Sequence, residues 1–457
     1  MTTRFDAIIV GAGQAGPSLA GRLAASGMSV AIVERKLFGG TCVNTGCTPT
    51  KTLVASAAVA HAARRAADYG VEIGGPVTVD LPAVMRRKNK VVTDSRSGVE
   101  GWLRGLDGCT VLTGHARFTG RDTLQVGAEE ITAPRIFLNV GGRALVPDMP
   151  GIDHVAVLTN RSILELETLP RHLVVVGGSY VGLEFAQVFC RFGSAVTVVE
   201  KGPRLVGRED EDVSSALADI LQAEGIALRM NAECIRFEPR GPDIAVGVNC
   251  HEGEPSVVGS HVLLAVGRRP NTDDLGLEVA GVATDARGYI VVGEDLQTNV
   301  PGIWALGDCN GRGAFTHTAY NDFEIVAANL LDGAARKVSE RILGYALYTD
   351  PPLGRVGMSE HEARAAGHAV KTGTRPMRRV ARAVEKGEPE GFMKVIVDGE
   401  TDRILGASIL GVGGDEAIHA VLEAMNAGVT ASAYTRAMPI HPTVSELLPT
   451  VLGELMG

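Results

Sequence analysis

The 457-residue sequence has no long hydrophobic run, no excess of positive charge and too few cysteines for a disulfide scaffold. No apolar segment approaches the ~18 residues that a transmembrane helix requires, so we expect no membrane partner. A net charge of −9 disfavours nucleic acid as a constant partner. The first residues, MTTRFDAIIVGAG, lack the basic and apolar regions of a secretion signal. These absences predict a cytoplasmic protein.

Glycine is the residue present in excess. The chain holds 57 glycines, about 12% of its residues, where ~7% is usual. Such an excess predicts tight turns and backbone that lies close to ligands. Hydrophobic content of 45% with 21% charged residues is ordinary for a folded globule, and the length corresponds to about three domains of ~150 residues.

The sequence contains an internal repeat. FDAIIVGAGQAG at 5–16 and HLVVVGGSYVG at 172–182 each place an apolar run before a glycine turn and a helical pattern. The offset from the first glycine to an acidic residue is 23 in both copies, Gly11 to Glu34 and Gly177 to Glu200. A strand, a glycine turn and a helix that returns to a strand form a βαβ unit with parallel strands. We therefore predict two nucleotide-binding domains.

Other patterns separate and follow these two copies. Short alternating stretches at 110–140 predict an antiparallel excursion, and GIWALGDC at 302–309 predicts a further strand that ends in a turn. After about residue 340, the order is strand, helix, paired strands with a turn at Asp398-Gly399, and helix. This α+β layer has no nucleotide fingerprint and predicts a third domain with a different role.

The first glycine turn is a complete G-x-G-x-x-G motif. Gly11 makes the tight turn, Gly13 lets the backbone approach a pyrophosphate, and Gly16 allows helix and strand to pack closely. The diphosphate is expected at the helix N-terminus, where free amides and the helix dipole favour anions. Glu34 is expected to accept a hydrogen bond from a ribose hydroxyl.

The second turn replaces the middle glycine by Ser179, which still permits a close approach. Glu200 favours NAD, because a 2′-phosphate there would meet a carboxylate. Lys201 and Arg204 follow and are either ligands of such a phosphate or a solvated basic edge. The turn predicted to bind this nucleotide comprises Gly177, Gly178, Ser179, Tyr180, Val181 and Gly182.

The segment GGTCVNTGCTPTK at 39–51 holds the one close pair of cysteines, Cys42 and Cys47. A disulfide across so small a loop contributes only about 2 kcal/mol, so a structural role makes little sense. Pro49 marks the first turn of an Ala-rich helix, which places Cys47 near a helix N-terminus that favours thiolate. Zinc is the alternative, but no second Cys or His pair stands at metal spacing, and we expect no metal. The remaining cysteines are expected to be buried small hydrophobes: Cys109, Cys190, Cys234, Cys250 and Cys309.

Across its whole length, this combination resembles the pyridine-nucleotide disulfide oxidoreductases, the group of dihydrolipoamide dehydrogenase, glutathione reductase and mercuric reductase. The resemblance implies FAD on the first fold, NADH or NADPH on the second, and a homodimer with a shared active site. It also implies an α/β fold with two Rossmann-like domains and a C-terminal α+β dimerisation domain. The predicted boundaries are 1–148 and 272–340 for FAD, 149–271 for NAD(P)H and 341–457 for the interface.

The resemblance also assigns roles to residues. Cys47 faces the flavin as the charge-transfer thiol and Cys42 attacks the substrate, while His441 acts across the dimer interface with Glu446 orienting its imidazole. Thiol–disulfide exchange requires such a group, because a leaving thiolate must be protonated and an attacking thiol deprotonated. Further matches are Lys51 beside the flavin, Glu184 as its ion-pair partner, Tyr180 as a gate of the nicotinamide pocket, and Gly267 at the NAD(P)H site. The implied FAD ligands are Gly11, Gly13, Gln14, Ala15, Gly16, Glu34, Arg35, Gly40, Thr41, Lys51, His115, Ala116, Gly141 and Asp308.

The substrate is expected to be a small oxidised-sulfur compound. Mercuric reductases usually end in a vicinal cysteine pair, whereas this chain has no cysteine after Cys309. Dihydrolipoamide dehydrogenases usually show His-Lys-Ala-Glu after the Gly-Asp motif, where this chain has AFTHTAYNDFEIVAANLLDG. That stretch is similar to mercuric reductase-like flavoproteins and to bacterial hypothiocyanous acid reductases. The open alternatives are dihydrolipoamide dehydrogenase, mercuric reductase, a thiol-independent NADH oxidase or quinone reductase, and a regulatory flavoprotein without turnover.

Overall fold

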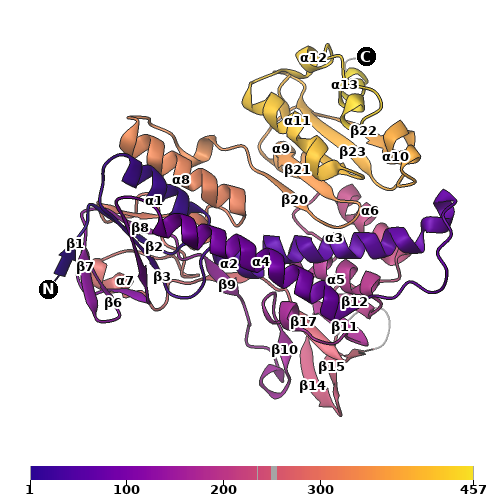
Figure 1. Ribbon diagram of the computed structural model, residues 1–457. Coiled ribbons are helices and arrows are strands. Elements are labelled where there is room, and N and C mark those ends of the chain that lie inside the picture. Colours follow the sequence, from indigo (N-terminus) through magenta and orange to yellow (C-terminus); the bar gives the residue numbers. More distant parts are fainter. Residues whose placement is uncertain (1, 234, 249–254, 456–457) are drawn as a thin grey trace. The chain divides into compact units, whose positions relative to one another are not determined.

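The computed structural model describes residues 2–233, 235–248 and 255–455 (Figure 1). The chain forms two compact units that interleave along the sequence. The first unit comprises Met1–Thr52, Ala83–Val146 and Val266–Arg341, and the second comprises Leu53–Pro82, Pro147–Ala265 and Ile342–Gly457. Within the described ranges, no helix is long and apolar enough to cross a membrane.

The first unit is built on a parallel sheet with the strand order β19-β8-β2-β3-β4. Its central strands are continuous apolar runs that are buried on both faces, as parallel sheets require. Helices α1 and α8 pack against one another, which Figure 1 shows beside the labels β2 and β8. The elements are β2 (Ala7–Val10), α1 (Ala15–Ala25), β3 (Val30–Glu34), β4 (Cys109–Thr113), β8 (Ile136–Leu138), β19 (Ile303–Ala305) and α8 (Thr316–Leu331).

The segment predicted as an antiparallel excursion is only partly antiparallel. Its first and last strands, β4 and β8, join the parallel sheet, because their apolar faces complete the buried core. The strands between them are antiparallel, and β1 adds to β7 in parallel. This smaller sheet has the order β1-β7-β6-β5, and a two-stranded sheet pairs β18 with β9. The bounds are β1 (Thr2–Arg4), β5 (Ala116–Phe118), β6 (Thr123–Val126), β7 (Glu129–Thr132), β9 (Gly142–Ala144), β18 (Arg268–Pro270) and α7 (Leu277–Ala280).

The second unit repeats the arrangement with a parallel sheet in the order β10-β17-β11-β12-β13. The predicted second nucleotide fold is therefore confirmed as a parallel α/β layer. A three-stranded antiparallel sheet, β14-β15-β16, follows β13 and was not predicted. The elements are β10 (Val157–Leu158), β11 (His172–Val176), α5 (Tyr180–Phe192), β12 (Ala195–Val199), α6 (Glu211–Ala223), β13 (Ala227–Arg229), β14 (Arg236–Arg240), β15 (Asp243–Gly247), β16 (Ser256–Gly259) and β17 (His261–Leu264).

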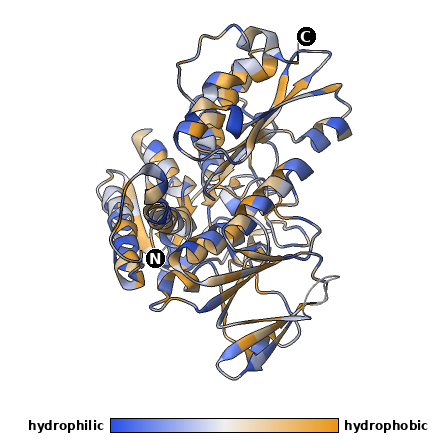
Figure 2. Cartoon of the chain, turned by 90° about the vertical axis from the view of Figure 1, so that its right-hand side faces the viewer, coloured by the Kyte–Doolittle hydropathy of each residue, from blue (hydrophilic) through white to orange (hydrophobic). Residues whose placement is uncertain are grey.

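The C-terminal part of the second unit is an antiparallel sheet in the order β20-β21-β24-β23-β22. Helix α11 packs on β21 and β24, and the predicted turn at Asp398-Gly399 does join β23 to β24. Figure 2 shows that hydrophilic and hydrophobic residues are mixed along the helices of the chain. The elements are β20 (Gly344–Leu347), β21 (Leu353–Gly357), α9 (Glu360–Ala365), β22 (Val370–Pro376), α10 (Ala381–Glu385), β23 (Phe392–Asp398), β24 (Ile404–Leu410), α11 (Gly414–Asn426), α12 (Ala431–Tyr434) and α13 (Leu448–Gly453).

Three helices follow the first βαβ unit in the sequence. A six-residue helix, α2 (Gly40–Thr45), precedes the 18-residue helix α3 (Cys47–Arg64). A 24-residue helix, α4 (Leu81–Arg104), comes next. The helix predicted to begin near Pro49 is α3, and it begins at Cys47; α2 and α4 were not predicted.

Candidate active site

The first glycine turn has the geometry that its spacing predicts. Gly11 adopts a positive φ of 106°, and a Cβ at this position would lie 2.3 Å from the carbonyl oxygen of Asn139. A Cβ at Gly16 would lie 2.2 Å from the carbonyl oxygen of Gly11. The amide of Ala12 donates to Oε2 of Glu34 at 3.0 Å, which holds the carboxylate at the turn. Only glycine fits at Gly11 and Gly16 without a shift of the backbone.

Asn139 anchors this turn from the adjacent strand β8. Its side chain is 7% exposed. Its Oδ1 accepts from the amide of Gly16 at 3.0 Å, and its Nδ2 donates to the carbonyl of Leu306 at 3.0 Å. Sequence analysis missed this residue, although a polar side chain that directly follows the apolar run IFL is a usable signal. Both functional ends of the amide are satisfied, as burial demands.

The cysteine segment packs directly on the first glycine turn. The amide of Gly39 donates to the carbonyl of Ala12 at 2.8 Å, and Nε2 of Gln14 donates to the carbonyl of Gly39 at 3.1 Å. Gly40 has a φ of +62°, and a Cβ there would lie 2.8 Å from Cα of Gly13. The two motifs that sequence analysis identified separately therefore form one continuous site in the first unit.

The two cysteines of this segment are free thiols on consecutive helices. Cys42 lies in α2 and is half-buried, whereas Cys47 is exposed and is the first residue of α3. The Cys42 thiol hydrogen bonds to Cys47, and this contact, together with burial, raises the pKa of Cys42. The charge of Lys51 opposes this rise. The raised pKa therefore favours the protonated form of the Cys42 thiol.

A hydroxyl from α8 completes the surroundings of the dithiol. Oγ1 of Thr316 lies 3.2 Å from Sγ of Cys47 and also hydrogen bonds to Cys42. Thr316 was not predicted as a site residue, although the segment that contains it, AFTHTAYNDFEIVAANLLDG, carries part of the family resemblance. Within the described residues, no group of three or more His, Cys, Asp or Glu side chains is arranged to hold a metal ion.

The remaining residues predicted to bind FAD fall into two groups in the first unit. Nη1 of Arg35 donates to Asp274 at 2.6 Å, and His115 contacts the carbonyl of Asp274 at 2.9 Å. Burial raises the pKa of Asp308, and the Arg268 guanidinium at 3.7 Å opposes that rise. Arg268 also lies 3.4 Å from Oγ1 of Thr41 and was missed by sequence analysis.

The second glycine turn reproduces the first in the second unit. Gly177 has a φ of +113°, and a Cβ at Gly182 would lie 2.1 Å from the carbonyl oxygen of Gly177. Glu200 accepts from the amide of Gly178 at 2.6 Å and from the amide of Gly202 at 2.7 Å. Ser179 is exposed and extended at the start of α5, so its side chain leaves the turn open.

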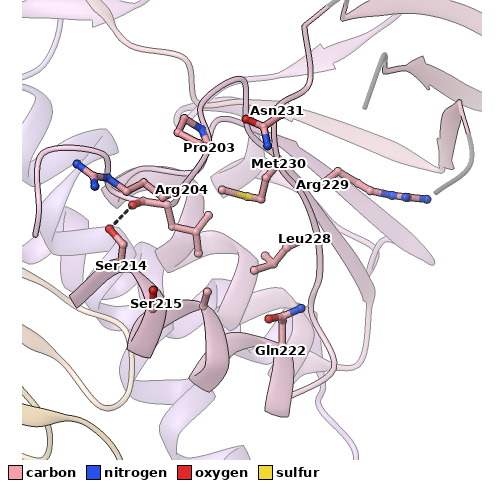
Figure 3. Close-up of a pocket in the computed structure, with 11 residues that line it drawn as sticks. Pro203, Arg204, Ser214, Ser215, Gln222, Leu228, Arg229, Met230 and Asn231 are labelled. Atoms are coloured by element: carbon pink, nitrogen blue, oxygen red, sulfur yellow. Dashed lines mark hydrogen bonds between the residues drawn. The ribbon is translucent and has the colours of Figure 1, made fainter. Parts of the chain in front are cut away.

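A cavity of about 500 Å³ lies beside the loop that follows Glu200 (Figure 3). It is lined by Arg204 from that loop, by Ser214 and Ser215 from α6, and by Arg229 and Asn231 at the end of β13. Nη2 of Arg204 donates to the carbonyl of Gly207 at 3.3 Å. Ligands of parallel α/β sheets bind outside the carboxyl ends of the strands, where this cavity lies.

His441 and Glu446 form a hydrogen-bonded pair in the C-terminal part of the second unit. Nδ1 of His441 lies 3.0 Å from Oε2 of Glu446. The imidazole is 74% exposed, whereas the carboxylate is 9% exposed. A largely buried carboxylate therefore contacts one ring nitrogen of an imidazole that faces solvent. Met438 and Ile440, in the same loop, are 95% and 79% exposed.

The other predicted positions have varied surroundings. Glu184 is buried and accepts from the amide of Tyr348 at 3.0 Å. Gly267, which was predicted to bind NAD(P)H, lies in the first unit, where its carbonyl accepts from the amide of Leu145 at 3.0 Å.

Of the other cysteines, Cys309 is buried as predicted, Cys109 and Cys190 are only half-buried, and Cys234 and Cys250 lie outside the described residues. Ala15 and Ala116 are buried, Val181 is exposed, and Gly141 has a φ of +64°.

Both turns fit a dinucleotide. Each has a backbone cradle that a Cβ would fill, a helix N-terminus directly behind it and a carboxylate held at the turn. The model of the family described as pyridine nucleotide-disulphide oxidoreductase matches residues 5–322, and the model of its dimerisation domain matches residues 344–452. The chain belongs to the pyridine nucleotide-disulphide oxidoreductase family. Its members use FAD and NAD(P)H, and the dimerisation domain supports a homodimer.

Relatives within the family cover nearly the whole chain. The probable pyridine nucleotide-disulfide oxidoreductase RclA of Escherichia coli is 36% identical over 97% of this chain and 98% of its own. A mercuric reductase of Streptomyces lividans is 34% identical over 98% of this chain and 95% of its own. A solved structure described as the Cu(II) complex of the HOCl-induced flavoprotein disulfide reductase RclA superposes with a TM-score of 0.90 at 35% identity over all of both chains. The protein is an FAD-dependent disulfide oxidoreductase of the RclA and mercuric reductase kind.

Proposed function

We propose that this enzyme uses NAD(P)H to reduce a small oxidised-sulfur compound, with hypothiocyanous acid as the favoured substrate. The observation that carries the proposal is the dithiol, Cys42 and Cys47, which packs on the first glycine turn beside a hydroxyl and without a cluster of metal ligands in the described chain. The RclA structure is described as HOCl-induced, which supports a role in defence against oxidants of this class.

The dithiol, the imidazole of His441 and the ammonium group of Lys51 have separate roles in the proposed reaction. FAD held at the first turn would supply the two-electron path from the nicotinamide to the Cys42–Cys47 disulfide. Because the raised pKa of Cys42 keeps its thiol protonated, this thiol needs a base before it attacks. The exposed imidazole of His441 of the partner subunit, which Glu446 orients, supplies that base. Lys51 adds positive charge near the dithiol and stabilises its thiolate form.

The thiol steps balance with hypothiocyanous acid as the substrate. Cys42 attacks the sulfur of HO–SCN, forms a Cys42–S–SCN bond, and the oxygen leaves as water after it takes a proton. Cys47 then attacks Sγ of Cys42, closes the disulfide and releases thiocyanate. The substrate gains two electrons, and the dithiol loses two. An organic disulfide follows the same steps, with a thiol as each leaving group.

A substrate panel tests this proposal. Purified holoenzyme is given NADH or NADPH with hypothiocyanite, lipoamide, glutathione disulfide, Hg(II), Cu(II) or a quinone, and nucleotide consumption is followed. We expect hypothiocyanite to give a kcat/KM about 10-fold or more above the others, the factor that ~1.4 kcal/mol of extra transition-state binding confers. Fast turnover of lipoamide would overturn this order. Activity that survives in a Cys42→Ala, Cys47→Ala double variant would favour the thiol-independent oxidase.

Metal-ion reduction is the second candidate function, because an RclA structure is a Cu(II) complex and the relatives include mercuric reductases. The dithiol supplies two soft ligands that suit such ions. The sequence has no cysteine after Cys309 that could deliver a metal to the dithiol. We therefore expect Hg(II) to be a poor substrate or an inhibitor, and efficient Hg(II) reduction would show that a C-terminal cysteine pair is dispensable.

A shared active site follows from this proposal and has its own test. If His441 acts in the partner's site, mixed Cys42→Ala and His441→Ala subunits regain about a quarter to half of the activity after co-refolding, by random pairing in a two-fold dimer. Hybrid dimers that are verified and remain inactive would contradict the shared site. We also infer a cytoplasmic location, where cellular thiol systems keep such a dithiol reduced.

A further inference from the structure

A buried carboxylate, Glu209, lies in the second unit and takes no part in the chemistry above. Its side chain is 1% exposed in the loop between β12 and α6. Oε1 accepts from the hydroxyls of Tyr180, at 3.3 Å, and Tyr345, at 2.5 Å. Oε2 lies 3.6 Å from Nε of Arg355, which is 3% exposed. The two tyrosine rings meet edge to face, with centroids 5.3 Å apart.

This cluster is costly for the fold. Oε2 of Glu209 and Nη2 of Arg355 are buried without a hydrogen-bond partner. Burial raises the pKa of Glu209, although Arg355 and both tyrosine hydroxyls oppose this rise. Burial also raises the pKa of Tyr180 and of Tyr345. Apolar residues of similar volume would avoid these costs, so stability alone does not explain the cluster.

The cluster is attached to the second glycine turn at two points. Tyr180 is the first residue of α5 and directly follows Gly177–Ser179. The loop that carries Glu209 also contacts the turn, because the amide of Val206 donates to the carbonyl of Gly178 at 2.8 Å. Val206 holds a positive φ of 41°, a strained conformation for a β-branched residue. The position of the turn thus depends on this loop as well as on the sheet.

The other side of the cluster belongs to the dimerisation domain. Tyr345 lies on β20 and Arg355 on β21, both within the residues that match the dimerisation-domain model. Arg355 is held in place by the carbonyl of Ala407, at 3.2 Å, and Oγ of Ser408, at 3.3 Å. Two of the groups that face Glu209, Tyr345 and Arg355, are therefore fixed by a sheet that is remote in sequence from the glycine turn.

We propose that Glu209 is a positioning residue of the pyridine nucleotide site, which holds Tyr180 and the second glycine turn against Tyr345 and Arg355 of the dimerisation domain. The inference rests on the proposed binding of NAD(P)H at that turn. Its consequence is that nucleotide affinity depends on a hydroxyl supplied by the dimerisation domain. Because such coupling is reciprocal, bound nucleotide also strengthens the attachment of the turn to that domain.

Two conservative variants and a matched control test the proposal in the FAD-loaded dimer. Glu209→Gln keeps the shape and removes the charge, Tyr345→Phe removes one hydroxyl, and Tyr434→Phe alters another half-buried tyrosine of the same unit. The dissociation constant of NADH is taken from the saturation of the flavin reduction rate. We expect about a 10-fold rise for Glu209→Gln and about a 3-fold rise for Tyr345→Phe, typical of one lost contact at an ordered site. The control is expected to stay within about 2-fold.

Two further readouts separate positioning from general stability. Amide hydrogen exchange at residues 177–182, measured without nucleotide, is expected to be faster in both test variants and unchanged in the control. In a double-mutant cycle, Tyr180→Phe with Glu209→Gln is expected to bind NADH more tightly than the sum of the two single effects predicts, because both changes weaken the same contact. Unchanged NADH affinity in both Glu209→Gln and Tyr345→Phe would overturn the proposal, as would full additivity in the cycle.

Failure of the proposed function gives a different result. Reduction of the holoenzyme by dithionite tests the dithiol without any nucleotide, and it is expected to develop the same thiolate–flavin absorbance in every positioning variant. If the wild type lacks that absorbance while Glu209→Gln still weakens NADH binding, the dithiol chemistry is wrong and the positioning role stands.

Discussion

The two glycine turns have nearly the same backbone but different anchors. In both, the first glycine has a φ above +100°, and a Cβ on the third glycine would lie within 2.2 Å of the first glycine's carbonyl oxygen. In both, the acidic residue 23 positions later accepts from the amide of the second turn residue. Asn139 anchors the first turn through a buried side-chain amide, whereas Ala265 follows the corresponding strand of the second sheet.

The anchor of the second turn comes from Glu209 and the dimerisation domain instead. The first turn, which is proposed to hold FAD, is fixed by a residue next to its own sheet. The second turn, which is proposed to bind and release a pyridine nucleotide in each cycle, is fixed by contacts that come from elsewhere in the chain. This comparison indicates that the glycine spacing specifies the shape of a dinucleotide turn, whereas the rigidity of the turn depends on contacts that are remote in sequence.

The largest expected effects separate the two turns by their third glycines. Gly16→Ala is expected to yield protein without bound FAD and to lower the free energy of unfolding by about 3 kcal/mol or more, because the Cβ overlaps a carbonyl oxygen. Gly182→Ala is expected to purify with FAD and to lose its response to NADH. The flavin absorbance of the purified proteins checks both results. FAD loss in Gly182→Ala would mean that the two sites are not independent.

Removal of the first anchor is expected to have the next largest effect. Asn139→Ala removes the side-chain acceptor of the Gly16 amide and leaves the carbonyl of Leu306 with the thiol of Cys309 as its donor, at a cost of about 1–3 kcal/mol of unfolding free energy. Denaturant unfolding and FAD retention measure this loss. Asn329→Ala, which breaks a more exposed amide contact in the same unit, is the control and is expected to cost less than about 1 kcal/mol. Equal losses in the two variants would contradict the anchor role.

The two carboxylates at the turns are expected to differ in what they control. Glu200→Gln is expected to lower kcat/KM for NADH about 10-fold, since a charged hydrogen bond to the ribose is lost, and to leave NADPH unaffected or improved. Glu34→Gln is expected to reduce FAD content without a change in the NADH to NADPH ratio. Steady-state kinetics with both nucleotides decide the matter. A large advantage of NADPH in the wild type would show that Lys201 and Arg204 outweigh Glu200.

The smallest expected effect is a pH dependence that only the second turn shows. Since burial raises the pKa of Glu209, its contribution to stability is fully present at acidic pH and is lost as pH rises through that raised pKa. NADH affinity changes in the opposite direction, because only the ionised carboxylate pairs with Arg355 and accepts charge-assisted hydrogen bonds from the two tyrosines. Titrations that run upward from the ordinary carboxyl range measure both trends, because burial raises the pKa of Glu209. Glu209→Gln is expected to remove the pH dependence of both the stability and the NADH affinity. The charged or titratable groups nearest to Glu209 are Tyr180 on α5, Asp210 before α6, Tyr345 on β20 and Arg355 on β21.

Sequence analysis predicted the parts of this molecule whose signals are local. The two nucleotide folds follow from glycine spacing and apolar runs, and the position of Cys47 follows from the proline two residues later. Helix α2, which carries Cys42, was missed because six residues with one glycine and one asparagine give no helical pattern. Strand β4 was assigned to an antiparallel group because its apolar residues alternate, although its partner is the parallel strand β3.

The buried contacts that anchor the site could not be predicted from the sequence, because they join residues that are far apart along the chain. Glu209 stands in the sequence GREDED, which has the composition of a solvated loop, and its partner Tyr345 is 136 residues away. Thr316 meets Cys47 across 269 residues, and one hydroxyl in a polar segment gives no local sign of that contact. Tertiary packing alone decides which charged and polar residues become buried.

The central claim is that Cys47 and Cys42 carry electrons between the flavin and the substrate. Anaerobic titration of the holoenzyme with NADH tests it most directly, since a Cys47 thiolate beside oxidised flavin produces a long-wavelength absorbance band. We expect the band to form in the wild type, to persist in Cys42→Ser and to vanish in Cys47→Ser. A band that survives in Cys47→Ser, or disulfide reductase activity in that variant, would contradict the account.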